Sequence, residues 1–253
     1  MARKNSIYIG FSNLNTEGYE YEVIDILGND RYVVEFKDSH YKTIKRSKEV
    51  KNGRIKDYYK PSVLNIGILG RELKKEDKEI HEIWRHMLLR CYDPYEINKH
   101  PTYIDCTVCK EWHNFQNFAK WYKENYYEVP NEKMHIDKDI LFKRNKTYNP
   151  DTCIFVPSRI NELFTKSNKN RGNYPVGVSW KKKNKKFQVQ CSILKDNKKT
   201  MKYLGLYDTV EEAFIIYKTF KENYIKQVAD EYKKYIPIEL YEAMYNYEVE
   251  LDD

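Results

Sequence analysis

The sequence predicts an α+β protein with a small β-rich N-terminal domain, a central ββα unit with flanking helices, and a C-terminal three-stranded sheet covered by one helix. Three patterns predict it. Short β-branched and aromatic runs lie between turn residues at the start, helically spaced apolar residues follow from residue 76, and strict alternation before a capped helix begins near residue 174. The expected parts are residues 1–62, 76–168 and 172–230, then an acidic helix and tail over 231–253.

The first domain is predicted from three strand-like runs at residues 19–27, 31–36 and 41–45, separated by tight turns. Such runs are typical of a small curled sheet or barrel. Its many lysines and arginines fit an accessory contact with DNA, and a domain that only packs fits about as well. Residues 61–75 are expected to be a linker.

The central part begins with apolar side chains at helical spacing over residues 76–91, ending before Pro94. Four aromatic residues then recur every third position from Trp112 to Trp121, on one face of a helix. We expect both stripes to be buried core rather than cofactor sites. A strand ending near Asp137, a turn-rich loop and a helix that Ser158 could cap complete this part.

The C-terminal part is predicted from strands at residues 177–181, 187–193 and 202–205, with a basic turn at 182–185. Thr209 and Glu212 form a capping-box pattern that opens an amphipathic helix. One helix can cover one face of the sheet, so the other face, which is polar, is expected to stay open. A short helix is expected over residues 237–247.

Charge is unevenly distributed along the chain, whose formal net charge is +7. Residues 165–202 hold twelve Lys and Arg against one Asp, and residues 230–253 hold eight acids against two Lys. The basic run alternates with apolar and aromatic residues, which favours a nucleic-acid surface and an acidic tail repelled by the same polyanion. We expect no signal peptide or membrane span, and reduced thiols at the five cysteines.

The candidate chemistry lies at Asp137 and Asn161. A carboxylate that leaves a short strand and an amide that enters from the following helix can meet at one divalent cation. A cation held by a carboxylate, an amide and waters is suited to cutting a phosphodiester. With the basic run downstream, the sequence predicts an enzyme that holds DNA with one part and cuts it with another.

Five segments in order resemble the HNH endonucleases of phages, especially the homing type, over about residues 80–164. The segments are Trp84-x-x-Met87-x-x-Arg90-Cys91, Val108-Cys109-x-x-Trp112-x-x-Phe115-x-x-Phe118, Ile136-Asp137-Lys138-Asp139, Tyr148-x-Pro150-x-Thr152-Cys153 and Asn161. The resemblance implies a ββα-metal nuclease core in which Asp137 and Asn161 bind Mg²⁺ or Mn²⁺, and a location in the cytoplasm of an infected bacterial host.

The chain departs from this family at its general base. Lys138 stands where the family has the histidine that activates water, which leaves the activity open, although Lys138 could instead clamp the phosphate. His135 lies two residues before Asp137, on the same side of a straight strand, and is the candidate base. Asp139 and Asn149 are expected to support the ligands, and Thr152 replaces the usual loop-holding asparagine.

Residues 174–222 resemble the APETALA-type DNA-binding domain of plant transcription factors, which phage homing endonucleases also carry. Gly177-Val178, Tyr203-Leu204-Gly205, Asp208-Thr209 and Glu211-Glu212-Ala213 with Tyr217 carry the likeness. In that family the sheet contacts the major groove, and few of the family's arginines are present here, so phosphate contact is the main expectation. The expected DNA-binding residues are Arg171, Ser179, Lys181, Lys183, Gln188, Gln190, Ser192 and Tyr203.

Cys106 and Cys109 have the spacing of half a zinc site, but the sequence has no second pair of this kind. Only a fold that brought Cys153 and His135 or His113 close could complete one. The pattern favours buried free thiols over structural zinc.

The leading hypothesis is thus a metal-dependent endonuclease whose partner is double-stranded DNA, with no small-molecule substrate. The alternative is a DNA-binding regulator, or a decoy that binds another protein, that keeps the HNH scaffold and lacks a working base. An RNA-binding protein would fit the charge and the 24 tyrosines, but not the Asp137 and Asn161 spacing.

Overall fold

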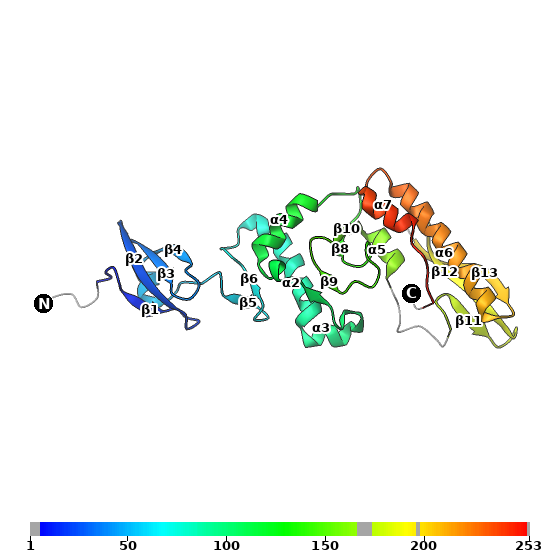
Figure 1. Ribbon diagram of the computed structural model, residues 1–253, viewed down its shortest axis with the longest axis horizontal. Helices are drawn as coiled ribbons and strands as arrows, with labels where there is room; N and C mark the ends of the chain where they lie inside the picture. Colours follow the sequence, from blue (N-terminus) through cyan, green and yellow to red (C-terminus); the bar gives the residue numbers. More distant parts are fainter. Residues whose placement is uncertain (1–5, 166–173, 196–197, 252–253) are drawn as a thin grey trace. The chain divides into compact units, whose positions relative to one another are not determined.

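The computed structural model describes residues 6–165, 174–195 and 198–251 (Figure 1). It contains helices and several sheets, which confirms the α+β class. The chain forms two compact units, Met1–Glu124 and Asn125–Asp253. This division falls inside the stretch 76–168, and the bounds of the four parts inferred from the sequence stay predictions.

The first unit begins with an antiparallel four-stranded sheet in sequence order (Figure 1). Its strands are β1 (Ser12–Leu14), β2 (Glu20–Gly28), β3 (Arg31–Phe36) and β4 (Lys42–Arg46), followed by α1 (Ser47–Asn52). Alternate residues of β2 and β3 are fully buried with Val50 and Ile55. The three predicted strands are confirmed; β1 and α1 were missed because they are too short to show a period.

The predicted linker over residues 61–75 is wrong. It contains β5 (Pro61–Val63), β6 (Gly67–Ile68) and the start of a 3₁₀ turn, Lys75–Asp77. Arg71 donates two hydrogen bonds of 2.7 and 3.1 Å to the fully buried carboxylate of Asp77. The ion pair between Arg71 and the buried Asp77 holds this stretch in place, and such a pair cannot be predicted from the local propensities of its residues.

Both predicted apolar stripes of the first unit are buried. Its helical elements are α2 (Lys78–Tyr92), α3 (Pro94–Lys99), α4 (Phe115–Asn125) and 3₁₀ turns at Pro101–Tyr103 and Lys110–His113; the short β7 is Thr107–Val108. Trp84 is fully buried and its indole N–H donates to the carbonyl of Trp112 at 2.6 Å. Trp112 lies in a 3₁₀ turn before α4 rather than in the helix itself.

The second unit places three short strands and a helix before a larger sheet (Figure 1). The first group is β8 (Met134–Asp137), β9 (Thr147–Tyr148), β10 (Ile154–Pro157) and α5 (Ser158–Phe164). The second is β11 (Val178–Lys181), β12 (Lys186–Lys195), β13 (Lys198–Tyr207), α6 (Val210–Tyr232) and α7 (Ile238–Tyr245). β10 pairs antiparallel with β8, and β11-β12-β13 form an antiparallel sheet. The predicted strands and helices of both groups are confirmed.

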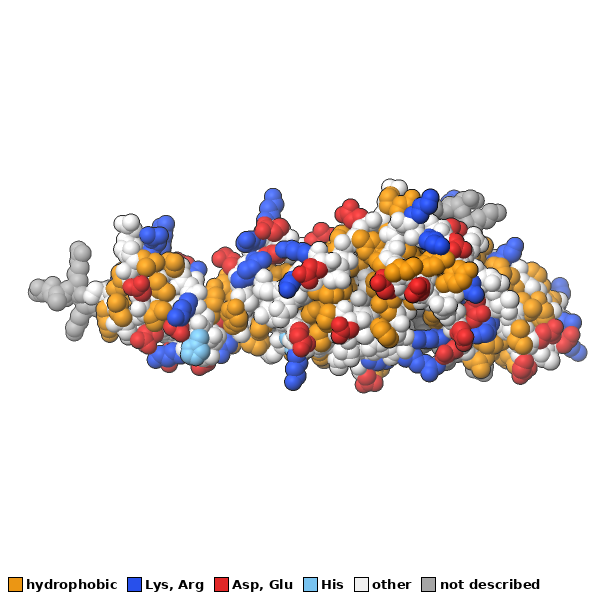
Figure 2. Space-filling view, turned by 45° about the horizontal axis from the view of Figure 1, so that its top comes forward, with side chains coloured by type: hydrophobic (Ala, Val, Ile, Leu, Met, Phe, Trp, Pro, Cys, Tyr) orange, Lys and Arg blue, Asp and Glu red, His pale blue; other side chains and the backbone are white. Residues whose placement is uncertain are grey.

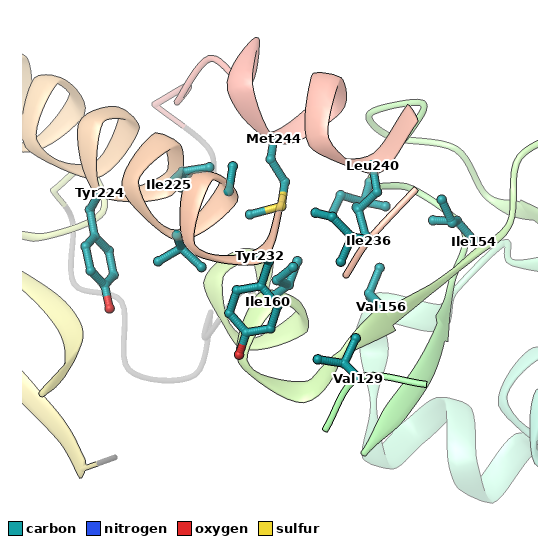
Figure 3. Packing of buried hydrophobic residues seen from close by; sticks show 13 residues of the cluster. Val129, Ile154, Val156, Ile160, Tyr224, Ile225, Tyr232, Ile236, Leu240 and Met244 are labelled. Atoms are coloured by element: carbon teal, nitrogen blue, oxygen red, sulfur yellow. The ribbon is translucent and has the colours of Figure 1, made fainter. Parts of the chain in front are cut away.

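Helix α6 belongs to both groups. Near its start, Ala213 and Tyr217 pack with the sheet, while Ile225 and Val228 pack with β10, α5 and α7. Figure 3 shows this second cluster, in which residues of α6 and α7 lie against Ile160 and the β10 side chains. Because α6 is one continuous helix of 23 residues, it links the two groups within a single compact unit.

Candidate metal site and nucleic-acid face

The β8–β10 register decides which way His135 and Asp137 point. Directly opposed residues of an antiparallel pair place their side chains on the same face. His135 is opposed to Val156, and Asp137 to Ile154. Val156 and Ile154 share a core cluster with Ile160 of α5. His135 and Asp137 therefore lie on the face of the hairpin that α5 covers.

Helix α5 presents polar groups to this face. The imidazole Nε2 of His135 lies 2.9 Å from the hydroxyl of Ser158. That hydroxyl donates to the carbonyl of Lys133 at 3.0 Å, so it accepts from Nε2–H, and the neutral ring then carries its lone pair on Nδ1. The predicted Ser158 cap is wrong, because Pro157 is the N-cap and Ser158 is the first helical residue.

Asn161 lies three residues after Ser158, on the same side of α5. It is half-buried, and within the described residues its side-chain amide makes no hydrogen bond. His135 and Asp137 on one side and Ser158 and Asn161 on the other thus come from elements in contact. The surface between the hairpin and α5 is apolar where Ile160 packs against Ile154 and Val156, and polar where His135 meets Ser158.

The Asp137 carboxylate is partly desolvated. Its Oδ1 accepts backbone hydrogen bonds from Asp139 at 2.9 Å and Ile140 at 2.7 Å. Burial, and then the negative charge of Asp139, raises the pKa of Asp137 to about 6, against the lowering effects of both backbone donors and of Lys138. A carboxylate that is costly to ionise in its own environment gains from a bound cation.

The donor set of this face fits a hard divalent cation. Carboxylate and amide oxygens are the ligands that Mg²⁺ and related ions take. Across residues 6–165, 174–195 and 198–251, no cluster of three or more His, Cys, Asp and Glu side chains could hold a metal ion. A cation at Asp137 and Asn161 would thus take its other ligands from water and phosphate oxygens, as Mg²⁺ commonly does.

Lys138 is buried, with 7 % of its surface exposed. Its ammonium lies 3.3 Å from the Asp139 carboxylate and 5.8 Å from the centre of the Tyr148 ring. The position at which the sequence resemblance leads us to expect a histidine is thus filled by an enclosed, ion-paired lysine. Asp139 connects the two neighbours, because it pairs with Lys138 and raises the pKa of Asp137.

The loop after β8 is tied by an asparagine that the sequence analysis missed. Asn145 donates to the carbonyls of Lys138 at 2.6 Å and Thr147 at 2.8 Å, and to the hydroxyl of Thr152 at 3.0 Å. It does the loop-holding expected of an amide at position 152. The signal available was an Asn two residues before a Thr in a turn-rich stretch, a pattern typical of Asx turns. Asn149 accepts two backbone hydrogen bonds from the same loop.

The C-terminal sheet carries the predicted DNA-binding residues on its open face. Val178, Val189 and Cys191 are buried against α6, so the alternate residues point away from it. Ser179 is opposed to Gln188, and Gln190 to the half-exposed Tyr203.

The remaining predicted contacts surround that open face. Ser192 and Lys181 lie on it, and Lys183 lies in the exposed β11–β12 turn. Arg171 lies outside the described residues. The side of the molecule drawn in Figure 2 shows basic and acidic side chains intermixed.

Gly177 explains one part of the APETALA-like pattern. Its φ of +75° is a left-handed conformation, and a Cβ there would lie 2.1 Å from the ring of Tyr217. The glycine lets the chain enter β11 directly over α6. The pairing of Gly177 and Tyr217 is therefore a packing requirement.

All five cysteines are free thiols. Burial raises the pKa of both Cys109 and Cys191, which keeps these thiols protonated. His113, the residue considered above as a possible zinc ligand, instead has its Nε2 nitrogen 3.1 Å from the carbonyl of Val108.

Among the described helices, none combines the length and the apolar composition that crossing a membrane requires. No protein-family model matches this chain, and no curated protein or solved structure shows significant similarity to it.

Proposed function

We propose that this protein is a divalent-cation-dependent DNA endonuclease of the HNH type, which binds duplex DNA through the open face of its C-terminal sheet. One observation carries the proposal: the β8–β10 register places His135 and Asp137 on the face of the hairpin that α5 covers, where His135 contacts Ser158, and α5 also carries Asn161. A strand carboxylate and a helix amide on one polar face are the donors that such a site needs.

Asp137 and Asn161 would hold the cation, which when bound would stabilise charge developing on the phosphate and on the leaving oxygen. His135 is the general base that the geometry favours. Ser158 fixes its ring by accepting from Nε2–H, which leaves the basic lone pair on Nδ1. Lys138 is enclosed by Asp139 and Tyr148, and its role is to fix the loop that carries Asp139.

Plasmid cleavage tests the proposal. We expect the protein to nick or linearise supercoiled DNA with Mg²⁺ or Mn²⁺, and a chelator to stop it. Loss of the ligand in Asp137→Ala should lower the rate at least about 100-fold, since metal-ion charge stabilisation amounts to several kcal/mol. Asp151→Ala is the matched control, an exposed acid in the loop before β10.

The enclosure of Lys138 also favours a second candidate, a DNA-binding regulator on the same scaffold. It predicts DNA binding with no cleavage under any cation, in the parent protein as in Asp137→Ala. That result would replace the endonuclease by the regulator.

A further inference from the structure

The loop after Asp137 presents an aromatic ring and two cations at its tip. The loop closes on itself where Asn145 donates to the carbonyl of Lys138 at 2.6 Å. Its tip carries Phe142, which is 55 % exposed, followed by Lys143 and Arg144. Arg144 has a φ of +69°, a conformation that glycine adopts more easily than arginine does.

Both cations of this tip hold one carboxylate from the C-terminal segment. Lys143 Nζ lies 3.3 Å from Oε1 of Glu250, and Arg144 Nη2 pairs with Oε2 of the same residue. Lys143 also donates to the carbonyl of Glu248 at 2.9 Å. Two oxygens carrying one negative charge are what a phosphodiester offers, so Glu250 has the charge and the acceptors of a phosphate group.

The segment that presents Glu250 is anchored to α6. Val249 is buried, its N–H donates to Glu222 at 2.8 Å, and its carbonyl accepts from Lys218 at 2.9 Å. The Tyr247 ring lies under Lys143, 4.7 Å from Nζ to the ring centre. This acidic stretch is therefore bound to a basic loop of the same chain, and its expected repulsion of a polyanion stays a prediction.

We propose that Lys143 and Arg144, with Phe142 beside them, form a phosphate-contact site for the DNA strand that enters the candidate cation site, and that Glu250 occupies this site until DNA displaces it. This inference rests on the proposed function. Cations next to an exposed aromatic residue suit a nucleic-acid strand, because phosphates pair with the cations and a base can stack on the ring. An internal carboxylate at the same place competes with the strand and lowers the affinity for DNA.

Salt-dependent DNA binding tests the proposal. The full-length chain carrying Asp137→Asn is titrated with a fluorescent duplex, without divalent cations, over a range of KCl concentrations. Glu250→Gln removes the competing charge. Each cation that Glu250→Gln frees to contact a phosphate should steepen the slope of log affinity against log salt by about 0.9. Relative to 1 M salt, that slope change makes binding at 0.1 M salt about 8-fold tighter.

Glu248→Gln is the matched control. It removes the same charge from the same segment, and the side chain of Glu248 forms no ion pair with any residue that the structure describes. We expect a slope close to that of the parent. Lys143→Gln with Arg144→Gln, added to Glu250→Gln, should abolish the gain.

Equal slopes for Glu250→Gln and Glu248→Gln would overturn the inference and leave the proposed function standing. So would a gain that survives the loss of both cations. If the parent chain shows no salt-dependent binding to duplex DNA, the proposed function fails and the inference falls with it. Far-UV circular dichroism melts verify that every variant is folded.

Discussion

At the scale of single residues, burial makes the Asp137 carboxylate costly to ionise, and a bound cation would offset that cost. Its pKa is raised to about 6 in the folded protein, so the folded state holds this proton more tightly than the unfolded chain. The contribution of Asp137 to the free energy of unfolding is therefore highest at low pH and declines as the pH rises from about 4 to about 6. The decline is at most about 3 kcal/mol.

We predict that Asp137→Asn removes this decline and makes the protein more stable than the parent above pH 6. Urea unfolding at a series of pH values measures it. Mg²⁺ or Mn²⁺ should raise the melting temperature of the parent and have little effect on the variant. A parent whose melting temperature is indifferent to both cations would contradict cation binding at Asp137.

A second residue-scale prediction separates the two candidate bases. Removing a general base lowers the chemical rate by about 10²–10⁴-fold. We expect His135→Gln to lower single-turnover plasmid cleavage by such a factor, because the amide can still bond Ser158 but cannot take a proton. Lys138→Met should cost much less. The opposite order of effects would assign the base to Lys138.

At the scale of elements, the alternation of β12 divides the C-terminal sheet into a buried and an open face. Lys181 and Lys186 are opposed across β11 and β12 and share the open face. Lys186 lies 3.1 Å from the Asp208 carboxylate, whereas Lys181 makes no ion pair within the described residues. The two lysines therefore form a matched pair of test positions.

We predict that Lys181→Gln weakens duplex binding. The slope of log affinity against log salt should become shallower by about 0.9, the value for one phosphate contact. Lys186→Gln should change the slope less, because its charge is already neutralised by Asp208. Fluorescence anisotropy across a salt series measures both. Equal slopes for Lys181→Gln and the parent would show that the open face is an ordinary solvated surface.

At the scale of the whole second unit, helix α6 packs both with the β8–β10 and α5 group and with the C-terminal sheet. Ile225 of α6 is fully buried in the cluster that includes residues of β10 and α5, while Ile215 on the same helix is 60 % exposed. Removing residues 174–229 as a supposed separate domain would strip Ile225 and Val228 from that cluster. The sheet and the candidate cation site therefore depend on each other for stability.

We predict that Ile225→Ala lowers the free energy of unfolding of this unit by about 2–4 kcal/mol, the usual cost of a large-to-small change in a packed core. Ile215→Ala should change it by less than about 0.5 kcal/mol. Hydrogen exchange should show β8, β10 and β12 losing protection together in Ile225→Ala. Loss confined to one group would contradict a shared core.

How far the sequence can predict each element depends on whether its signal is local. The strands β2, β3 and β12 and the helices α2 and α6 follow from side-chain period, because each buries one face and is long enough to show the pattern. Thr209 caps α6 as predicted, accepting from the N–H of Glu212. The stretch 61–75 did not follow, since its order comes from a buried ion pair.

The sequence by itself determined the α+β class, the order of the longer strands and helices, the buried aromatic stripes and the open polar face of the C-terminal sheet, because these depend on neighbours along the chain. Only the tertiary structure decided that His135 faces Ser158, that Asn145 ties the loop, that Lys138 is enclosed and that Glu250 holds Lys143 and Arg144. Each of these depends on strand register or on contacts between segments far apart in sequence, and neither is encoded in local period or composition.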